Sequence, residues 1–110
     1  MGDKVKRIYI PMTETGFYIL FFLQNEMHGN NIEQKVKQMT YGDIRISSGT
    51  MYGSLSKMEK DGWIEFLKEE EKRKFYIITD LGKEILEIEL KRIERLYKNS
   101  KEAMVDGKEN

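Results

Sequence analysis

Seven apolar side chains follow one another from Phe17 to Leu23, in the run FYILFFL. Periodicity alone does not separate a buried strand from a helix in such a run. Because the run lies behind Thr13, a good N-cap residue, and ahead of Gly29, we predict a helix from Thr13 to about Met27. A helix that is apolar on all sides must be covered on all sides. In a chain of 110 residues, we expect one face to meet the domain core and another to meet a second subunit.

The composition excludes several classes of protein. Without cysteine, the chain has no disulfide, thiolate zinc site or cysteine nucleophile. One histidine, His28, is too little for a histidine metal site or a serine triad, so we predict no metal, no cofactor and no catalytic residue. No stretch reaches the roughly 18 apolar residues of a membrane span, and no secretory leader is visible. We therefore expect a cytoplasmic protein, not an enzyme, without membrane contact.

Two more helices are predicted after the first. Gly29 would close the first helix with a left-handed turn, and Asn30 or Asn31 would cap the second. The second helix would bury Ile32, Val36 and Met39. After a turn at 41–43, Ser47 or Ser48 would cap a third helix that ends at Gly62. The buried stripe of this third helix would consist of Met51, Leu55 and Met58.

Aromatic and β-branched residues then predict a hairpin. The segments 63–68 and 75–78 enclose the polar stretch EEEKRK, which has no glycine to fix the turn type. Trp63, the one tryptophan, is expected in the core. Thr79 or Asp80 would start a last helix that runs to about Met104.

The order of helix, helix, turn, helix and hairpin is that of a winged helix-turn-helix. We predict a mainly α fold with a small β-hairpin. Residues 1–79 would form an arm and the winged DNA-binding domain, 80–104 a C-terminal dimerisation helix, and 105–110 a disordered tail.

Three stretches of the sequence resemble the PadR family of bacterial transcriptional regulators. They are HGNNIEQKV at 28–36, ISSGTMYGSLSKMEKDGWIE at 46–65 and KRKFYIITDLGKEIL at 72–86. The most specific part is the Gly-Thr-x-Tyr step at 49–52, followed by Gly62 and by Tyr76-x-x-Thr79-x-x-Gly82. The family usually has an aromatic residue where Asn30 stands and leucine where Met51 stands. The second of these departures nearly conserves volume.

The resemblance and the residue types predict a DNA-binding surface on the third helix and the hairpin. Small and hydroxyl residues allow close approach of a helix backbone to phosphates, and the helix N-terminus adds partial positive charge. The alternative is a purely structural role for these residues. Ser48 and Thr50 would then only cap the helix, and Tyr52 would pack on the wing. The basic residues of the wing would belong to a solvated charge run. The predicted DNA contacts are Ser48, Gly49, Thr50, Tyr52, Gly53, Ser56, Lys57, Lys72, Arg73 and Lys74.

The last helix carries a heptad stripe that would be covered by a second copy of the chain. Its residues are Leu86, Leu90, Ile93, Tyr97 and Met104. A second stripe of Leu81, Ile85 and Ile88 would pack on the winged domain. The alternative is that the heptad stripe folds back on its own domain. The resemblance also implies small aromatic or drug-like effectors at helix interfaces, with Phe22 and Tyr97 as a candidate effector pocket. The predicted dimer interface consists of Phe17, Phe21, Leu86, Leu90, Ile93 and Tyr97.

The sequence therefore predicts a homodimeric PadR-like regulator that binds double-stranded DNA at a near-palindromic operator. Repression is implied by the family, and no activation surface is apparent. The alternative is a winged-helix protein-interaction module without operator binding. Nineteen basic and nineteen acidic residues leave no net charge, so DNA binding would depend on where the charges are placed.

Overall fold

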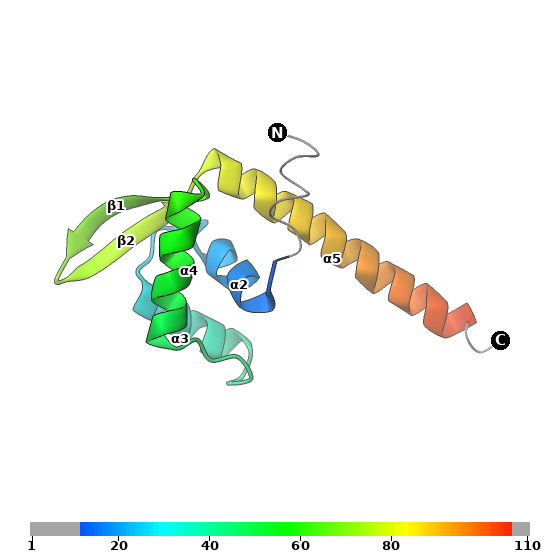
Figure 1. The fold of residues 1–110 in the computed structure, drawn as a ribbon. Coiled ribbons are helices and arrows are strands. Elements are labelled where there is room, and N and C mark those ends of the chain that lie inside the picture. Colours follow the sequence, from blue (N-terminus) through cyan, green and yellow to red (C-terminus); the bar gives the residue numbers. More distant parts are fainter. Residues whose placement is uncertain (1–11, 107–110) are drawn as a thin grey trace.

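The computed structural model describes residues 12–106, and it has the mainly helical fold predicted from the sequence (Figure 1). In this part of the chain, three helices are followed by a two-stranded antiparallel sheet and a long last helix. Within these residues, no helix is long and apolar enough to cross a membrane. The elements are α2 (Glu14–Phe22), α3 (Gly29–Met39), α4 (Ser48–Lys60), β1 (Ile64–Glu70), β2 (Arg73–Ile78) and α5 (Asp80–Asp106).

The core forms where α2, α3 and α4 meet the base of the hairpin and the start of α5. The predicted stripe of α4 is buried, and Trp63 is buried as expected. In α3, Ile32 and Val36 are buried, but Met39 is 51% exposed, contrary to prediction. Met39 is the last residue of α3, and the exposed turn 41–43 follows one residue later.

The first helix is shorter than predicted, and its end was wrongly placed. α2 stops at Phe22, and the following backbone pairs with β2 instead. The Ile78 amide donates to the Leu23 carbonyl at 2.8 Å, and Met27 and Tyr76 exchange two backbone hydrogen bonds of 3.2 and 3.0 Å. These long-range bonds satisfy backbone groups that a longer α2 would have used internally.

The start of α3 also differs from the prediction. Gly29 does not close α2 but is the first residue of α3, and neither Asn30 nor Asn31 is its cap. His28 is the N-cap, and its Nδ1 accepts a hydrogen bond from the Asn31 amide at 3.3 Å. A histidine side chain thus takes the N-cap role that Ser, Thr, Asp or Asn usually has.

The boundaries of α4 and the hairpin follow from local backbone chemistry. Ser47 caps α4 by accepting from the Thr50 amide, and Gly62, with φ +81°, follows its C-terminal end. Glu70 pairs with Arg73, which leaves a two-residue turn of Glu71 and Lys72. Both turn residues have positive φ, 51° and 66°. The hairpin therefore closes through a type I′ turn made without glycine.

The long helix α5 starts where the sequence predicted. The Thr79 hydroxyl donates to the Trp63 carbonyl and accepts from the Gly82 amide. A Cβ at Gly82 would lie 2.1 Å from the Trp63 carbonyl oxygen, so the close approach of α5 to Trp63, the residue before β1, requires glycine here. The helix extends to Asp106, beyond the predicted end at Met104, and 107–110 of the predicted tail lie outside the described residues.

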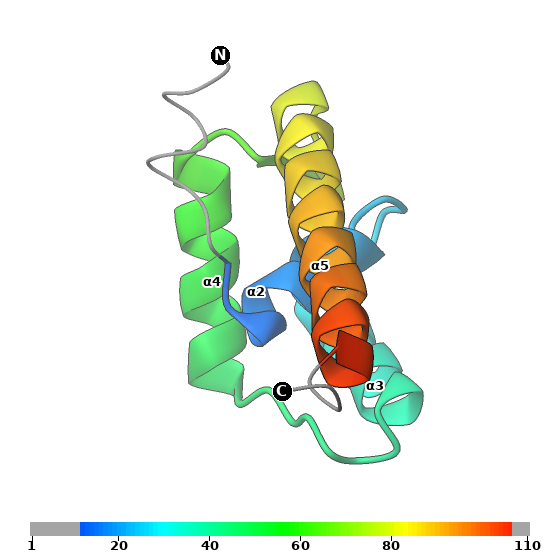
Figure 2. The ribbon, with the colours of Figure 1, turned by 90° about the vertical axis from the view of Figure 1, so that its right-hand side faces the viewer.

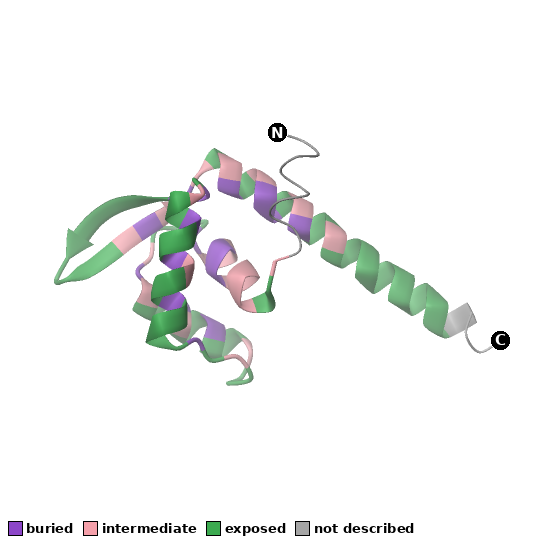
Figure 3. Cartoon of the chain, in the orientation of Figure 1, coloured by how far each residue is buried: buried purple, intermediate pink, exposed green. Residues whose placement is uncertain are grey.

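Only the first half of α5 contributes to the core. It crosses close to α2 and then projects away from the domain, as two views at right angles show (Figures 1 and 2). Buried residues end at Glu89, and the rest of the helix is largely exposed (Figure 3). The prediction that Leu86 belongs to an exposed dimer stripe was wrong, because Leu86 is 3% exposed in the core of its own domain.

Candidate nucleic-acid interface

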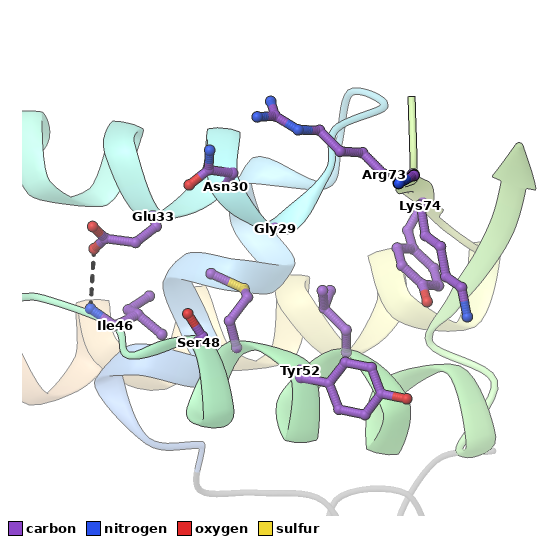
Figure 4. A pocket seen from close by; sticks show the side chains of 12 residues that line it. Gly29, Asn30, Glu33, Ile46, Ser48, Tyr52, Arg73 and Lys74 are labelled. Atoms are coloured by element: carbon purple, nitrogen blue, oxygen red, sulfur yellow. Dashed lines mark hydrogen bonds between the residues drawn. The ribbon is translucent and has the colours of Figure 1, made fainter. Parts of the chain in front are cut away.

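A groove of about 460 Å³ lies between α4, the start of α3 and the tip of the hairpin (Figure 4). Asn30 comes from α3 and Tyr52 from α4, and they face the basic residues of the hairpin tip. We call this cavity the recognition groove. Of the predicted DNA contacts, those that line it are Ser48, Tyr52, Lys72, Arg73 and Lys74.

The remaining predicted contacts lie on the outer face of α4. This face is exposed and consists of small residues, with Tyr52 69% exposed beside them. A Cβ added at Gly49 or Gly53 would meet no atom within 4 Å. The helix backbone is therefore open to a large partner. The other members of this face are Thr50, Ser56 and Lys57.

The alternative that the polar residues at the start of α4 only cap the helix holds for one of the two residues. Ser48 is exposed and is not the cap, because Ser47 takes that role. Thr50 does belong to the cap, since its Oγ1 accepts from the Ser47 hydroxyl at 3.0 Å. Lys57 forms an ion pair with Asp61 at 2.9 Å, so its charge is partly compensated.

The basic residues of the hairpin tip are not paired with the neighbouring glutamates. Instead, Glu70 pairs with Lys68, which lies 3.2 Å from Glu70 and 3.3 Å from Glu26. These contacts raise the pKa of Lys68. Within residues 12–106, no carboxylate lies within ion-pair distance of Lys72, Arg73 or Lys74. Three cations are therefore left available beside the groove.

His28 joins the wing to the start of α3, which the sequence did not reveal. Its Nε2 lies 3.3 Å from Nη1 of Arg73, and its ring stacks edge-on against Phe75 with centroids 5.0 Å apart. The side chain is 7% exposed. Burial, and then the nearby Arg73 cation, lower the pKa of His28 from 6.5. The neutral form of the ring therefore predominates at pH 7.

This lowered pKa predicts a pH dependence of stability. Below about pH 6.5, the unfolded chain takes up a proton at His28 that the folded chain resists. We expect the free energy of unfolding to fall between about pH 7.5 and pH 5.5, with a weaker dependence in His28→Asn. Chemical denaturation at a series of pH values measures this slope. Equal slopes in both proteins would contradict the assignment, and Glu33 and Glu89 do not interfere because they titrate in a more acidic range.

Glu33 connects α3 to the segment that leads into α4. Its carboxylate accepts from the Ile46 amide at 3.0 Å (Figure 4) and from Arg45 Nη2 at 3.2 Å. The backbone hydrogen bond from Ile46, followed by the contact with Arg45, lowers the pKa of Glu33. Glu33 therefore fixes the turn that sets α4 against α3, a role for which the sequence carried no signal.

A second cavity of about 410 Å³ lies between α2 and α5. Phe17 and Leu90 line it, together with Ile93 from α5. The described lining of this cavity does not include Phe22 or Tyr97, the predicted effector pocket. Phe17 and Phe21 are half-buried and stacked, with centroids 6.0 Å apart. The exposed fractions of Leu90, Ile93 and Tyr97 are 43%, 40% and 63%.

One buried carboxylate lies at the edge of this second cavity. Glu89 has no exposed surface and accepts from Arg92 at 2.7 and 3.0 Å and from the Met12 amide at 3.0 Å. Burial raises the pKa of Glu89, but these donors outweigh burial and lower it overall. The contact fixes the residue that precedes α2 to the middle of α5.

Comparisons with known proteins agree with this geometry. Residues 19–88 match the sequence profile of the transcriptional regulator PadR-like family. A transcriptional regulator from Clostridium thermocellum superposes with a TM-score of 0.71 at 24% identity, over 93% of this chain and 96% of the other. A PadR family regulator from Clostridium difficile gives a TM-score of 0.73 at 24% identity, over 84% and 99%.

A third solved structure contains nucleic acid. Bacillus subtilis PadR in complex with operator DNA superposes with a TM-score of 0.62 at 26% identity. The match covers 68% of this chain and 45% of that protein. No curated protein matches the chain.

Proposed function

Because the chain belongs to the PadR-like family of transcriptional regulators, we propose that it binds operator DNA as a homodimer and represses transcription there. The observation that carries this proposal is the open glycine and hydroxyl face of α4 beside the three unpaired cations of the wing. Such a helix suits the major groove, and such a wing suits the adjacent phosphates. The complex of Bacillus subtilis PadR with operator DNA supports the same use of this fold.

A homodimer accounts for the apolar surface that one subunit leaves open. The exposed stripe of α5 contains Leu90, Ile93 and Tyr97, and half-buried aromatic residues of α2 lie near its start. A two-fold axis through this surface would present two copies of α4 to successive major grooves, ~34 Å apart. The operator would then be near-palindromic, and the dimer would repress by occupying it in the cytoplasm.

The cavity between α2 and α5 supports regulation by a small effector. Phe17 and Tyr18 give it aromatic walls, and the ion pair of Arg92 with Glu89 lies at one edge. A small aromatic or drug-like molecule bound here would alter how α5 leaves the domain, and hence the spacing of the two α4 helices. Phe22 and Tyr97 do not line this cavity in one subunit. They would contact the effector only if dimer formation brought them beside the cavity.

A protein-interaction module is the second candidate function. The zero net charge and the three glutamates at 69–71, which flank the basic tip, favour it. Salt dependence separates the two functions, because DNA binding releases counterions and protein association does so to a smaller extent.

Binding of the wild type to a labelled duplex from its own promoter region tests the proposal. If the dimer contacts about six to ten phosphates, affinity should fall ~10³- to 10⁵-fold between about 50 and 200 mM salt. A scrambled duplex of equal length is the control and should bind more weakly. A shallow salt dependence, or equal affinity for both duplexes, would favour the interaction module.

Gly53→Ala separates stability from DNA binding on α4. Alanine in a helix interior should raise the free energy of unfolding by about 0.5–1 kcal/mol, since the space beside Gly53 is open. The added methyl group would crowd a DNA backbone or base edge, and we expect operator affinity to fall about tenfold. Denaturation and fluorescence anisotropy measure the two effects.

Asn99→Ala on the exposed part of α5 is the matched control for Gly53→Ala. It should stabilise its helix without changing DNA affinity. If Gly53→Ala binds DNA as tightly as the wild type, this face of α4 does not lie against DNA.

A further inference from the structure

We propose that His28 is a positioning residue that holds the Arg73 guanidinium at the recognition groove for contact with a DNA phosphate. The inference rests on the proposed function and adds a residue that the predicted DNA contacts omit. His28 is the N-cap of α3 and precedes Gly29, which lines the groove, and Arg73 is the first residue of β2. The two are 45 residues apart in the sequence and are joined by the contact between Nε2 and Nη1 at 3.3 Å.

The chemistry of the neutral ring decides the direction of this contact. Arginine only donates, so the contact requires a lone pair on Nε2 of His28. The Asn31 amide, 3.3 Å from Nδ1, requires a lone pair on the other nitrogen. A neutral imidazole has one such lone pair, so His28 accepts from Arg73 in one tautomer and from Asn31 in the other. The two hydrogen bonds therefore exclude each other, and the ring holds Arg73 in the tautomer that does not accept from the Asn31 amide.

Arg73 needs such a support because nothing else in residues 12–106 fixes it by a hydrogen bond. Arg73 is exposed, and its only side-chain hydrogen-bond partner in this part of the chain is His28. One N–H directed to His28 leaves the other guanidinium donors free to bind a phosphate. Orienting the side chain beforehand lowers the entropy lost on binding.

The surroundings of the ring make it a support and not a source of positive charge. The Phe75 ring lies nearly perpendicular to the His28 ring, and the Lys68 ammonium lies over Phe75, 5.1 Å from the Phe75 ring centroid. Lys68 is itself paired with Glu26 and Glu70. Arg73 is thus the charged group in direct contact with His28, and a protonated ring would repel Arg73 and could accept neither hydrogen bond.

His28→Asn and Arg73→Met form a double-mutant cycle for this inference. Asparagine is a strong N-cap and keeps an acceptor for the Asn31 amide, but has no atom that reaches Arg73. Affinity for a fluorescent mixed-sequence duplex of about 30 base pairs is measured at about 50 mM salt, since phosphate contacts do not depend on sequence. We expect His28→Asn to weaken binding about fivefold when Arg73 is present and to have no effect in Arg73→Met.

A pH profile gives a readout that a purely structural role would not move. His28 is the only histidine of the chain, so a change between about pH 7.5 and pH 5.5 that is absent from His28→Asn belongs to it. We expect wild-type affinity to fall on acidification, because the protonated ring releases Arg73. A rise would show that His28 acts as a cation on the phosphate, and would overturn the inference.

The outcomes separate the inference from the proposed function. If the wild type binds neither the mixed-sequence duplex nor its promoter duplex, the proposed function fails. If the wild type binds and the effect of His28→Asn is the same with and without Arg73, only the positioning role fails. Equal denaturation midpoints of His28→Asn and the wild type near pH 7.5 exclude loss of fold as the cause; if the midpoint falls, His28→Gln, which keeps an acceptor toward Arg73, should recover the lost affinity.

Discussion

Replacing Leu90 and Ile93 by glutamate should convert the homodimer into monomers and lower operator affinity by at least about 100-fold. Both side chains are about two-fifths exposed in one subunit, and a second copy would bury them. Four carboxylates brought together in an apolar interface would be desolvated without partners, which costs several kcal/mol. A monomer presents one α4 instead of two and loses the ~10²- to 10⁴-fold gain of linked binding. Sedimentation equilibrium and fluorescence anisotropy measure the two effects.

Lys91→Gln with Lys98→Gln is the matched control for this prediction. It changes the net charge by the same amount on the exposed part of α5, where both lysines pair only with glutamates one turn away. The control should remain dimeric and bind DNA. A stable dimer of the Leu90→Glu and Ile93→Glu variant would show that α5 does not form the interface through this stripe.

Replacing Lys72, Arg73 and Lys74 together by alanine should lower DNA affinity by about 100-fold or more, equally on all sequences. For each phosphate that the variant no longer binds, the slope of log affinity against log salt should fall by ~0.9. Because the dimer has two wings, the total change in slope should be twice that of one subunit. The fold should persist, because Lys72 already holds positive φ with a Cβ and alanine adds no strain. Anisotropy titrations over a range of salt measure both the affinity and the slope.

Lys83, Lys91 and Lys98 on α5 provide the control for the wing. Replacing these three by alanine removes the same charge from a helix that does not line the recognition groove. This variant should keep most of the affinity and the full salt slope. Unchanged binding of the wing variant would remove the wing from the mechanism of DNA binding.

The sequence predicted the elements whose signals are local. Met51, Leu55 and Met58 are spaced to one helix face, and Ser47 and Gly62 carry the chemistry of a helix start and end. These features do not depend on distant parts of the chain. Consequently α4, the hairpin and the start of α5 could all be placed from the sequence.

The errors arose where distant backbone or side chains decide the outcome. The continuous apolar run of α2 has no periodicity to mark its end, and β2 claims the backbone of Leu23 and Met27. Leu86 continues the heptad stripe in the sequence, but α2 and the core of the same subunit already bury this part of α5. Glu89 looks like a surface residue in the sequence, although the Met12 amide, 77 residues away, binds it in the structure.

In the recognition groove too, residues with a local signal were predicted from the sequence, and residues defined by long-range contacts were not. The residues of α4 and the wing tip were identified from their types and from the family resemblance. Neither His28 nor Glu33 was identified, because the contacts that define their roles, with Arg73 and with Ile46, join different elements. Their side chains give no separate signal in the sequence.

The central claim is that the outer face of α4 and the wing tip lie against duplex DNA. Titration of the isotope-labelled wild type with its promoter duplex, followed by backbone amide NMR, tests this claim residue by residue. We expect the largest changes at residues 48–57 and 72–74, and small changes in the exposed half of α5. Changes centred on α5, with the amides of 48–57 and 72–74 unmoved at saturation, would contradict the claim.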